Sequence, residues 1–379
     1  MPLPMTRLLL LVAIAATVVA MAAAGALTNA TGQSQALDRA VPRSDGRLLV
    51  SEFGEHASTL FLVDPRYPAA RQEFGRVPHA PGWELVGAVS PRGDAFAYLV
   101  LPPGAGDPAR EMALILRTES EARFLASGFD IGGGLLWSRD GGSLFLRRSG
   151  EDDRPAQRIV QIDAGTGLET PRFQGRGSLG VYPVAKPPAG PLYIALIDPS
   201  GSALLAIGDD GRVQRTLKLS GSATRDWTLS PDGSQLAYTE QRGLQLTVRV
   251  TALASDPPTL ASAAYRDDGL GEAQASGGSA APVWHPDGSL SVGTFQHAAG
   301  GALHVAAARA PALDGQSRDG FALPVAWSED GAHLALRAFS GSGPGAVGEE
   351  KTAVMGPDGR LHAIEGRFVS VFGWWYGTD

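Results

Sequence analysis

Several segments of this 379-residue chain are rich in acidic and basic residues, and we predict these segments to be loops. Such side chains could hold a cationic partner, or could supply carboxylates for acid–base chemistry. The candidates come from three segments, of which the last is a long insertion: Glu151, Asp152 and Asp153; Arg225 and Asp226; and Asp267, Asp268 and Glu272. A fourth segment, 341–351, adds Glu349 and Glu350. We expect these loops to bind a cationic or peptidic partner, with solvated acidic loops as the alternative.

Other chemistry-bearing motifs are scarce. The chain has no cysteine, which excludes disulfides and cysteine-ligated zinc. It has neither a G-x-S-x-G nor an H-E-x-x-H motif. The segment 175–180 matches G-x-G-x-x-G, but a strand follows it where a dinucleotide site needs a helix. We predict no cofactor, no metal and no catalytic residue. The alternative is an enzyme of the lactonase or glycan-acting type that uses carboxylates such as Asp226 or Asp268.

The overall charge narrows the class of partner. The formal net charge is −7, and lysine and arginine do not cluster on any periodic face. Nucleic-acid binding needs a concentrated basic surface. We therefore predict no nucleic-acid partner. We also expect a protein or peptide partner and a monomeric chain.

A repeated sequence motif predicts the strands that these loops connect. An apolar residue precedes Ser-x-Asp-Gly or a variant of it, and alternating apolar residues follow. The copies are marked by Ser44, Ser90, Ser138, Ser230, His285 and Ser328. The first spacings are 46 and 48 residues, and the gap of 92 after Ser138 predicts a degenerate copy near residue 187, with Gly190 in its turn. A period of this length is typical of β-propeller blades.

The repeat predicts an all-β fold. Asp-Gly between alternating apolar segments indicates a tight hairpin, so we interpret Asp140, Asp232, Asp287 and Asp330 as turn residues and not as calcium ligands. We expect seven four-stranded antiparallel blades, with six or eight as alternatives. The C-terminal segment ends in a strand that should complete the first blade and close the ring.

Tryptophans mark the ends of several predicted inner strands. Trp137, Trp284, Trp327 and Trp374 share one position in the repeat, where a large ring packs between blades. Trp83 and Trp227 fall out of phase with it, which leaves a ligand-binding role open.

The turns at Ser90, Ser230 and His285, with the variants at Ser138 and Ser328, resemble the WD40-like repeats of TolB-like propellers, a family of bacterial extracytoplasmic proteins. The resemblance covers residues 41–379 and implies a non-catalytic propeller that binds a protein or peptide in the cell envelope.

The N-terminal segment predicts export. Arg7 precedes an apolar run from Leu8 to Ala26, and small residues follow, as in a secretory signal. We assign residues 1–27 to a signal peptide or an uncleaved signal anchor, 28–40 to a flexible linker and 41–379 to the propeller. The protein is then periplasmic or extracellular, and contacts a membrane only through the N-terminal segment if that segment is uncleaved.

Overall fold

The computed structural model describes residues 45–130, 132, 134–148, 157–175, 177–243, 245–253, 263–264, 277–296, 303–306, 321–341 and 347–377. The signal segment and linker expected within residues 1–40 lie outside these ranges. In the described part of the chain, no helix is long and apolar enough to cross a membrane.

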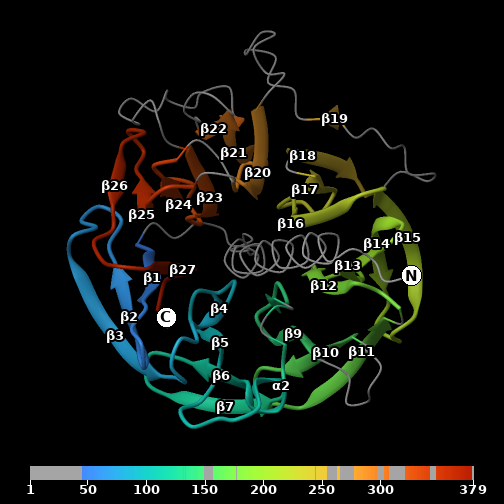
Figure 1. The fold of residues 1–379 in the computed structure, drawn as a ribbon, viewed down its shortest axis with the longest axis horizontal. Coiled ribbons are helices and arrows are strands. Elements are labelled where there is room, and N and C mark those ends of the chain that lie inside the picture. Colours follow the sequence, from blue (N-terminus) through green and yellow to red (C-terminus); the bar gives the residue numbers. More distant parts are fainter. Residues whose placement is uncertain are drawn as a thin grey trace, which may run out of the picture.

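The described strands form six four-stranded antiparallel sheets and a further sheet in which three strands are described (Figure 1). Sheets 1 to 3 contain, in order, β27 (Val369–Trp375), β1 (Arg47–Glu52), β2 (Ala57–Val63) and β3 (Arg71–Pro78); β4 (Val86–Val89), β5 (Phe96–Val100), β6 (Ala113–Arg117) and β7 (Ala122–Ser127); and β8 (Leu135–Trp137), β9 (Ser143–Arg148), β10 (Gln157–Asp163) and β11 (Glu169–Gly175).

Sheets 4 to 7 continue the ring. They contain, in order, β12 (Gly180–Ala185), β13 (Leu192–Asp198), β14 (Gly201–Ile207) and β15 (Val213–Ser220); β16 (Ala223–Leu229), β17 (Gln235–Arg242), β18 (Gln245–Ala252) and β19 (Ala263–Ala264); β20 (Gly277–Trp284), β21 (Leu290–Gln296) and β22 (Leu303–Ala306); and β23 (Phe321–Trp327), β24 (Leu334–Phe339), β25 (Glu350–Met355) and β26 (Leu361–Ala363).

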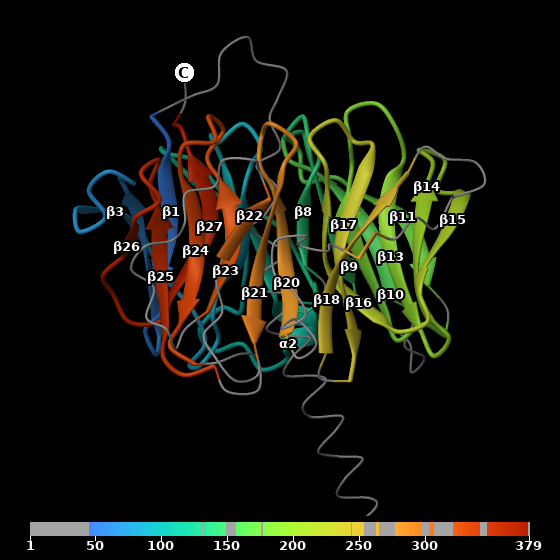
Figure 2. The same cartoon turned by 90° about the horizontal axis from the view of Figure 1, so that it is seen from above.

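This arrangement is a β-propeller, as the repeat predicts. The first strand of each sheet lies nearest the axis, and the strands run along the axis from one end of the molecule to the other (Figures 1 and 2). We call the end with the turns between the first and second strands the turn face. The opposite end, with the connections between the second and third strands and between sheets, is the loop face.

The core lies between neighbouring sheets, because each sheet buries its apolar side chains against the next. One cluster joins Leu114 of β6 to Leu146 of β9, and another joins Leu49 of β1 to Phe96 of β5. All four side chains are fully buried. A single helical turn, α2 (Pro108–Glu111), lies in the connection between β5 and β6 and was not expected from the sequence.

The Asp-Gly motifs of the repeat form hairpin turns. The hydroxyls of Ser138, Ser230 and Ser328 each donate to the aspartate two residues on, at 2.6 Å. The bond from Ser230 is the main reason that the pKa of Asp232 falls to about 2. The interpretation of these aspartates as turn residues is thus confirmed.

The repeated tryptophans pack between blades. The indole nitrogen of Trp137 donates to the carbonyl of Ala88 on the preceding sheet at 2.9 Å, and that of Trp374 donates to Ala326 at 3.3 Å. Trp284 donates in the same way to Thr228, at 3.2 Å. Each indole therefore fixes one sheet against its neighbour, as predicted from its position in the repeat.

The two ends of the described chain close the ring. Strand β27 pairs antiparallel with β1, from Arg47 opposite Trp375 to Glu52 opposite Val369. Just beyond β27, the backbone N–H of Tyr376 donates to Gly93 O at 2.8 Å, and its hydroxyl accepts from the N–H of Glu329 at 2.8 Å. The predicted closure by the C-terminal strand is confirmed.

The degenerate fourth repeat also forms a sheet, and a neighbour compensates for its irregular turn. Gly190 lies in the turn between β12 and β13, as expected. Arg139, from the β8–β9 turn, donates its backbone N–H to Lys186 O at 3.1 Å and its guanidinium to Pro231 O at 3.0 Å. The side chain of Arg139 thus joins the turn of sheet 3 to the turn of sheet 5, and the irregular turn of sheet 4 lies between them.

Candidate functional site

The structure describes two of the eight residues that the sequence nominates for a site. Arg225 and Asp226 lie within β16, not in a loop, and pair at 3.2 Å. The side chain of Asp226 is only 5% exposed. The other six, Glu151, Asp152, Asp153, Asp267, Asp268 and Glu272, lie outside the described residues.

Asp226 occupies a bulge that recurs in the innermost strands. Its φ is 53°, and the pairing register shifts between Arg225 and Thr228. In the next sheet Ala281 has the same φ, within a register shift between Ala280 and Val283. Since alanine adopts this conformation at the matching place, the bulge belongs to the blade architecture and does not by itself mark a site.

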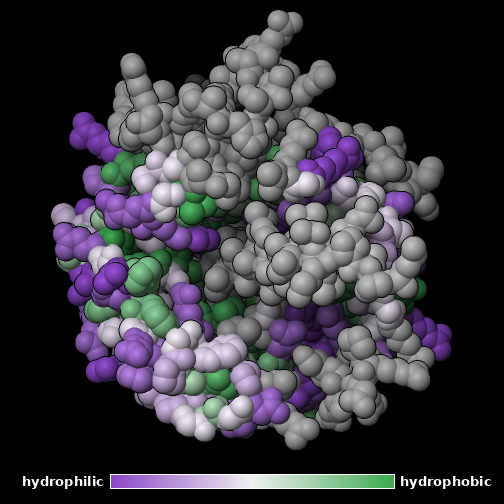
Figure 3. Space-filling view, viewed as in Figure 1, coloured by the Kyte–Doolittle hydropathy of each residue, from purple (hydrophilic) through white to green (hydrophobic). Residues whose placement is uncertain are grey.

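A cavity of about 840 Å³ opens on the loop face between sheets 7, 1 and 2. It is formed by β24, β25, the segment from β26 into β27, and the start of β4. Its apolar lining includes Leu85, Val325, Ile364, Val371 and Phe372. Viewed down the axis, apolar and hydrophilic residues lie interspersed over sheets 1 and 7 (Figure 3). The size lies within the range of ligand-binding pockets.

Charged side chains line the same cavity, and most of them are paired. Arg337 of β24 binds both carboxylate oxygens of Glu350, at 2.5 and 2.8 Å. Lys351 lies 3.8 Å from Glu349. The sequence placed Glu349 and Glu350 in a loop of this face, and the structure places them at this cavity.

Apart from the exposed Glu365, Glu84 just before β4 is the exception among these acids. Its carboxylate accepts a hydrogen bond from the Ser370 hydroxyl, and it has no ion-pair partner among the described residues. Burial raises the pKa of Glu84, and Glu350 adds to the effect, although Ser370, Arg337 and His79 act in the opposite direction. The sequence analysis missed this residue, because one glutamate before an apolar strand carries no distinctive spacing.

Phe368 projects from the segment between β26 and β27 at this cavity. Its side chain is 67% exposed, and its φ of 54° is unusual for a bulky residue. The segment is held from sheet 1: Glu52 accepts from the N–H of Arg367 at 2.9 Å, and Arg71 donates to Glu365 O at 2.8 Å. The backbone that carries the ring is therefore held at the cavity in a conformation that costs free energy.

A serine–histidine pair lies nearby but is inaccessible. Ser58 and His79 are 3.2 Å apart, and the other ring nitrogen of His79 lies 2.9 Å from Ala80 O. The two residues are 0% and 1% exposed, so no substrate reaches the hydroxyl in this conformation. We interpret the pair as a satisfied buried contact.

The two out-of-phase tryptophans are packing residues. Trp227 is 5% exposed, donates to the Thr224 hydroxyl at 2.9 Å and packs against the Tyr182 ring. Trp83 is half-buried against the core between sheets 2 and 3. The ring of Trp227 is therefore closed to a ligand. Within the described ranges, no three histidine, aspartate or glutamate side chains could hold one metal ion.

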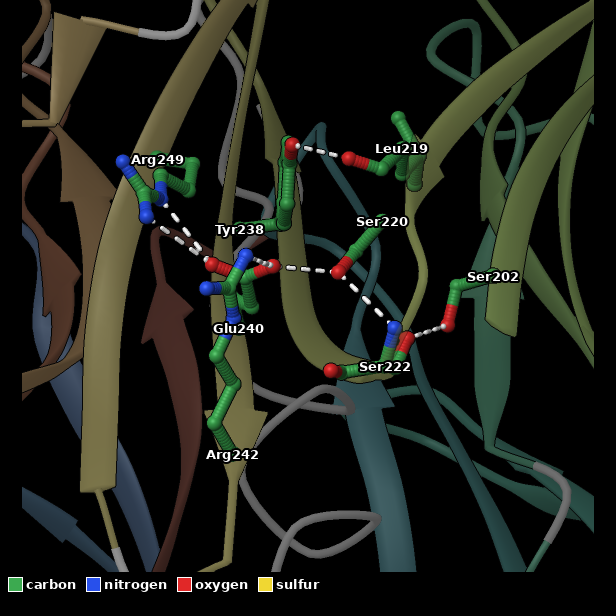
Figure 4. Close-up of polar contacts among 8 residues, drawn as sticks. All are labelled: Ser202, Leu219, Ser220, Ser222, Tyr238, Glu240, Arg242 and Arg249. Atoms are coloured by element: carbon green, nitrogen blue, oxygen red, sulfur yellow. Dashed lines mark hydrogen bonds and ion pairs between the residues drawn. The ribbon is translucent and has the colours of Figure 1, made fainter. Parts of the chain in front are cut away.

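A second charged cluster, between sheets 4 and 5, surrounds the buried carboxylate of Glu240 (Figure 4). Glu240 accepts bonds from Ser220 of the neighbouring sheet, from Arg242 at 3.0 Å, and from Arg249 at 3.0 and 3.1 Å. Burial alone raises the pKa of Glu240, but these hydrogen bonds outweigh it and hold the pKa below its usual value. With its carboxylate fully engaged, this cluster holds blades together and leaves no group free for a ligand.

No protein-family model and no curated protein matches this chain. Solved structures similar to it include a prolyl endopeptidase, with a TM-score of 0.60 and 14% identity over 93% of this chain and 52% of the other. Prolyl oligopeptidase B from Galerina marginata has a TM-score of 0.56 and 13% identity over 86% and 52%. TolB from Acinetobacter baumannii has a TM-score of 0.48 and 14% identity over 86% and 81%.

The likenesses to the two prolyl peptidases establish the fold. The chain is a β-propeller. It spans about half the length of the prolyl peptidases that it matches. Because the identities are so low, the likenesses assign no activity to it.

Proposed function

We propose that this protein is a non-catalytic, extracytoplasmic propeller of seven blades that binds a protein or peptide partner of the bacterial cell envelope. The binding site is the loop-face cavity between sheets 7, 1 and 2. The exposed ring of Phe368 beside an 840 Å³ cavity carries the proposal. An aromatic side chain held in place loses little conformational freedom on binding, which suits an anchor for a partner.

The composition of the cavity favours a peptide segment. The exposed Phe368 and the half-buried Val369 provide apolar contact area, and the charged residues of the cavity can fix the direction of a bound chain. The enzyme alternative has less support. Asp226, one of its proposed carboxylates, is buried and already paired with Arg225, while Asp268 lies outside the described residues.

Site-specific photo-crosslinking tests the location of the site. Benzoylphenylalanine placed at residue 368 of the full chain should crosslink to a discrete partner in intact cells. Phe124 provides a matched control, because it is an aromatic side chain 59% exposed on β7, away from the cavity. Crosslinking from both positions to the same products, or from neither, contradicts the proposal.

Export is tested separately. Fractionation of the native source followed by N-terminal sequencing should recover the protein outside the cytoplasm. A mature terminus between Ala22 and Ala30 indicates a cleaved signal, and an intact N-terminus indicates an anchor. Recovery of the full chain in the cytoplasm contradicts the envelope role.

A further inference from the structure

Two of the carboxylates at the cavity, those of Glu365 and Glu84, have no ion-pair partner among the described residues, and of the two only Glu84 is half-buried while Glu365 is exposed. The glutamates lining it are Glu84, Glu349, Glu350 and Glu365, and the cations are Arg337, Lys351 and Arg367. Arg337 forms an ion pair with Glu350, and Lys351 lies beside Glu349. Arg367 lies over the ring of Phe368, with its guanidinium carbon 5.1 Å from the centroid. Among the described residues none of these cations pairs with Glu84.

We propose that the cavity takes a basic side chain of the bound partner, a lysine or an arginine, whose cation pairs with the carboxylate of Glu84. This inference rests on the proposed function and specifies which partner segments the site selects. Ser370 already donates to one oxygen of this carboxylate. That bond leaves the carboxylate further lone pairs with which to accept a cationic donor.

The apolar lining suits the rest of such a side chain. Phe368 and Val369 line the same cavity, and their apolar side chains are 67% exposed and half-buried, respectively. Lysine and arginine carry aliphatic stems that pack on apolar surface while the charged group reaches a polar partner. An anionic side chain in this position would be repelled by Glu84, and a neutral one would leave the carboxylate unpaired.

A set of matched peptides tests the inference on the full-length protein. The probes are acetylated, amidated octapeptides with a fluorescein label, built from leucine, serine and glycine. They differ only at one central position, which is lysine, arginine, norleucine or glutamate. Affinities are measured by fluorescence anisotropy at low ionic strength. We expect the lysine and arginine peptides to bind about tenfold more tightly than the norleucine peptide, and the glutamate peptide to bind most weakly.

Three variants test whether Glu84 causes the preference for basic peptides. Glu84→Gln should abolish the preference for the basic peptides over the norleucine peptide. Glu365→Gln, which removes an exposed charge from the same cavity, should keep the preference within about twofold. Phe368→Ala should weaken all peptides alike. Urea unfolding of each variant confirms that it is folded.

The outcomes separate this inference from the function on which it rests. Equal binding of the lysine and norleucine peptides, or a preference that survives in Glu84→Gln, overturns the inference alone. So does the absence of peptide binding when residue 368 still crosslinks to a partner. If no peptide binds and residue 368 gives no crosslink, the proposed function fails and the inference fails with it.

Discussion

Ser220 of β15 donates a hydrogen bond to the carboxylate of Glu240 on β17, and this bond joins sheet 4 to sheet 5 (Figure 4). A charged group is costly to bury unless it is fully paired. Glu240 is 4% exposed, and its two oxygens are shared between Ser220, Arg242 and Arg249. This carboxylate therefore adds a polar connection to the apolar packing at this blade boundary.

Glu240→Gln should destabilise the protein by about 2–4 kcal/mol, because Arg249 then loses the charge of its partner in a mostly buried setting. Urea unfolding at pH 7 measures the change. Glu119→Gln, which changes an exposed glutamate, should stay within about 0.5 kcal/mol of the wild type. Equal midpoints for the two variants would show that the network adds nothing.

The same carboxylate should make stability depend on acid pH. The folded-state pKa of Glu240 lies below its ordinary value of 4.5. Its contribution is therefore fully present above pH 4.5 and is lost as the pH falls through the folded-state value. We expect the stability difference between the wild type and Glu240→Gln to shrink below pH 4.5. A difference that stays constant down to pH 2.5 is the contrary result.

Closure of the ring depends on a close approach of Tyr376 to Gly93. Gly93 has a φ of 71°, and a Cβ there would lie 2.3 Å from the Tyr376 ring. Gly82 has a similar φ of 77°, but its Cβ would meet nothing within 4 Å. Gly82→Ala should cost about 1 kcal/mol for the backbone conformation alone, and Gly93→Ala about 2–4 kcal/mol. Similar losses in urea unfolding would mean that the ring contact is unimportant.

The architecture was largely predictable because the repeat is local. Each Ser-x-Asp-Gly turn, and the tryptophan before it, acts within a few residues, so its spacing along the chain indicates the sheets directly. Even the pairing of β27 with β1 followed from counting one more period beyond Ser328. The turn beside Gly190 was found in the same way, from the gap that it had to fill.

The cavity was not predictable in this way, because it is assembled from distant parts of the chain. Glu84 and Ser370 meet through closure of the ring although they lie 286 residues apart. Each is an ordinary residue in its own segment. The prediction for Arg225 and Asp226 was wrong in another way. The sequence placed this charged pair in a loop, but the structure places it at a bulge within β16. A strand bulge leaves no clear signature in composition.

Glu84 offers a final prediction that needs no ligand. Burial raises its folded-state pKa above the ordinary value of 4.5, with Ser370, Arg337, Glu350 and His79 as the neighbouring groups that modify it. A raised carboxyl pKa means that the folded state binds the proton more tightly than the unfolded state, so the ionised group opposes folding at neutral pH.

Glu84→Gln should therefore raise the urea midpoint at pH 7, and its advantage should disappear below pH 4.5, where the carboxyl is protonated in both states. A gain in stability together with loss of the preference for basic peptides is the expected signature of a site that keeps a charge for its ligand. Glu365→Gln, at an exposed position of the same cavity, should leave the midpoint within error. If Glu84→Gln destabilises the protein at pH 7, the ionised carboxylate of Glu84 stabilises the fold. That result contradicts its assignment as a binding group for a cation.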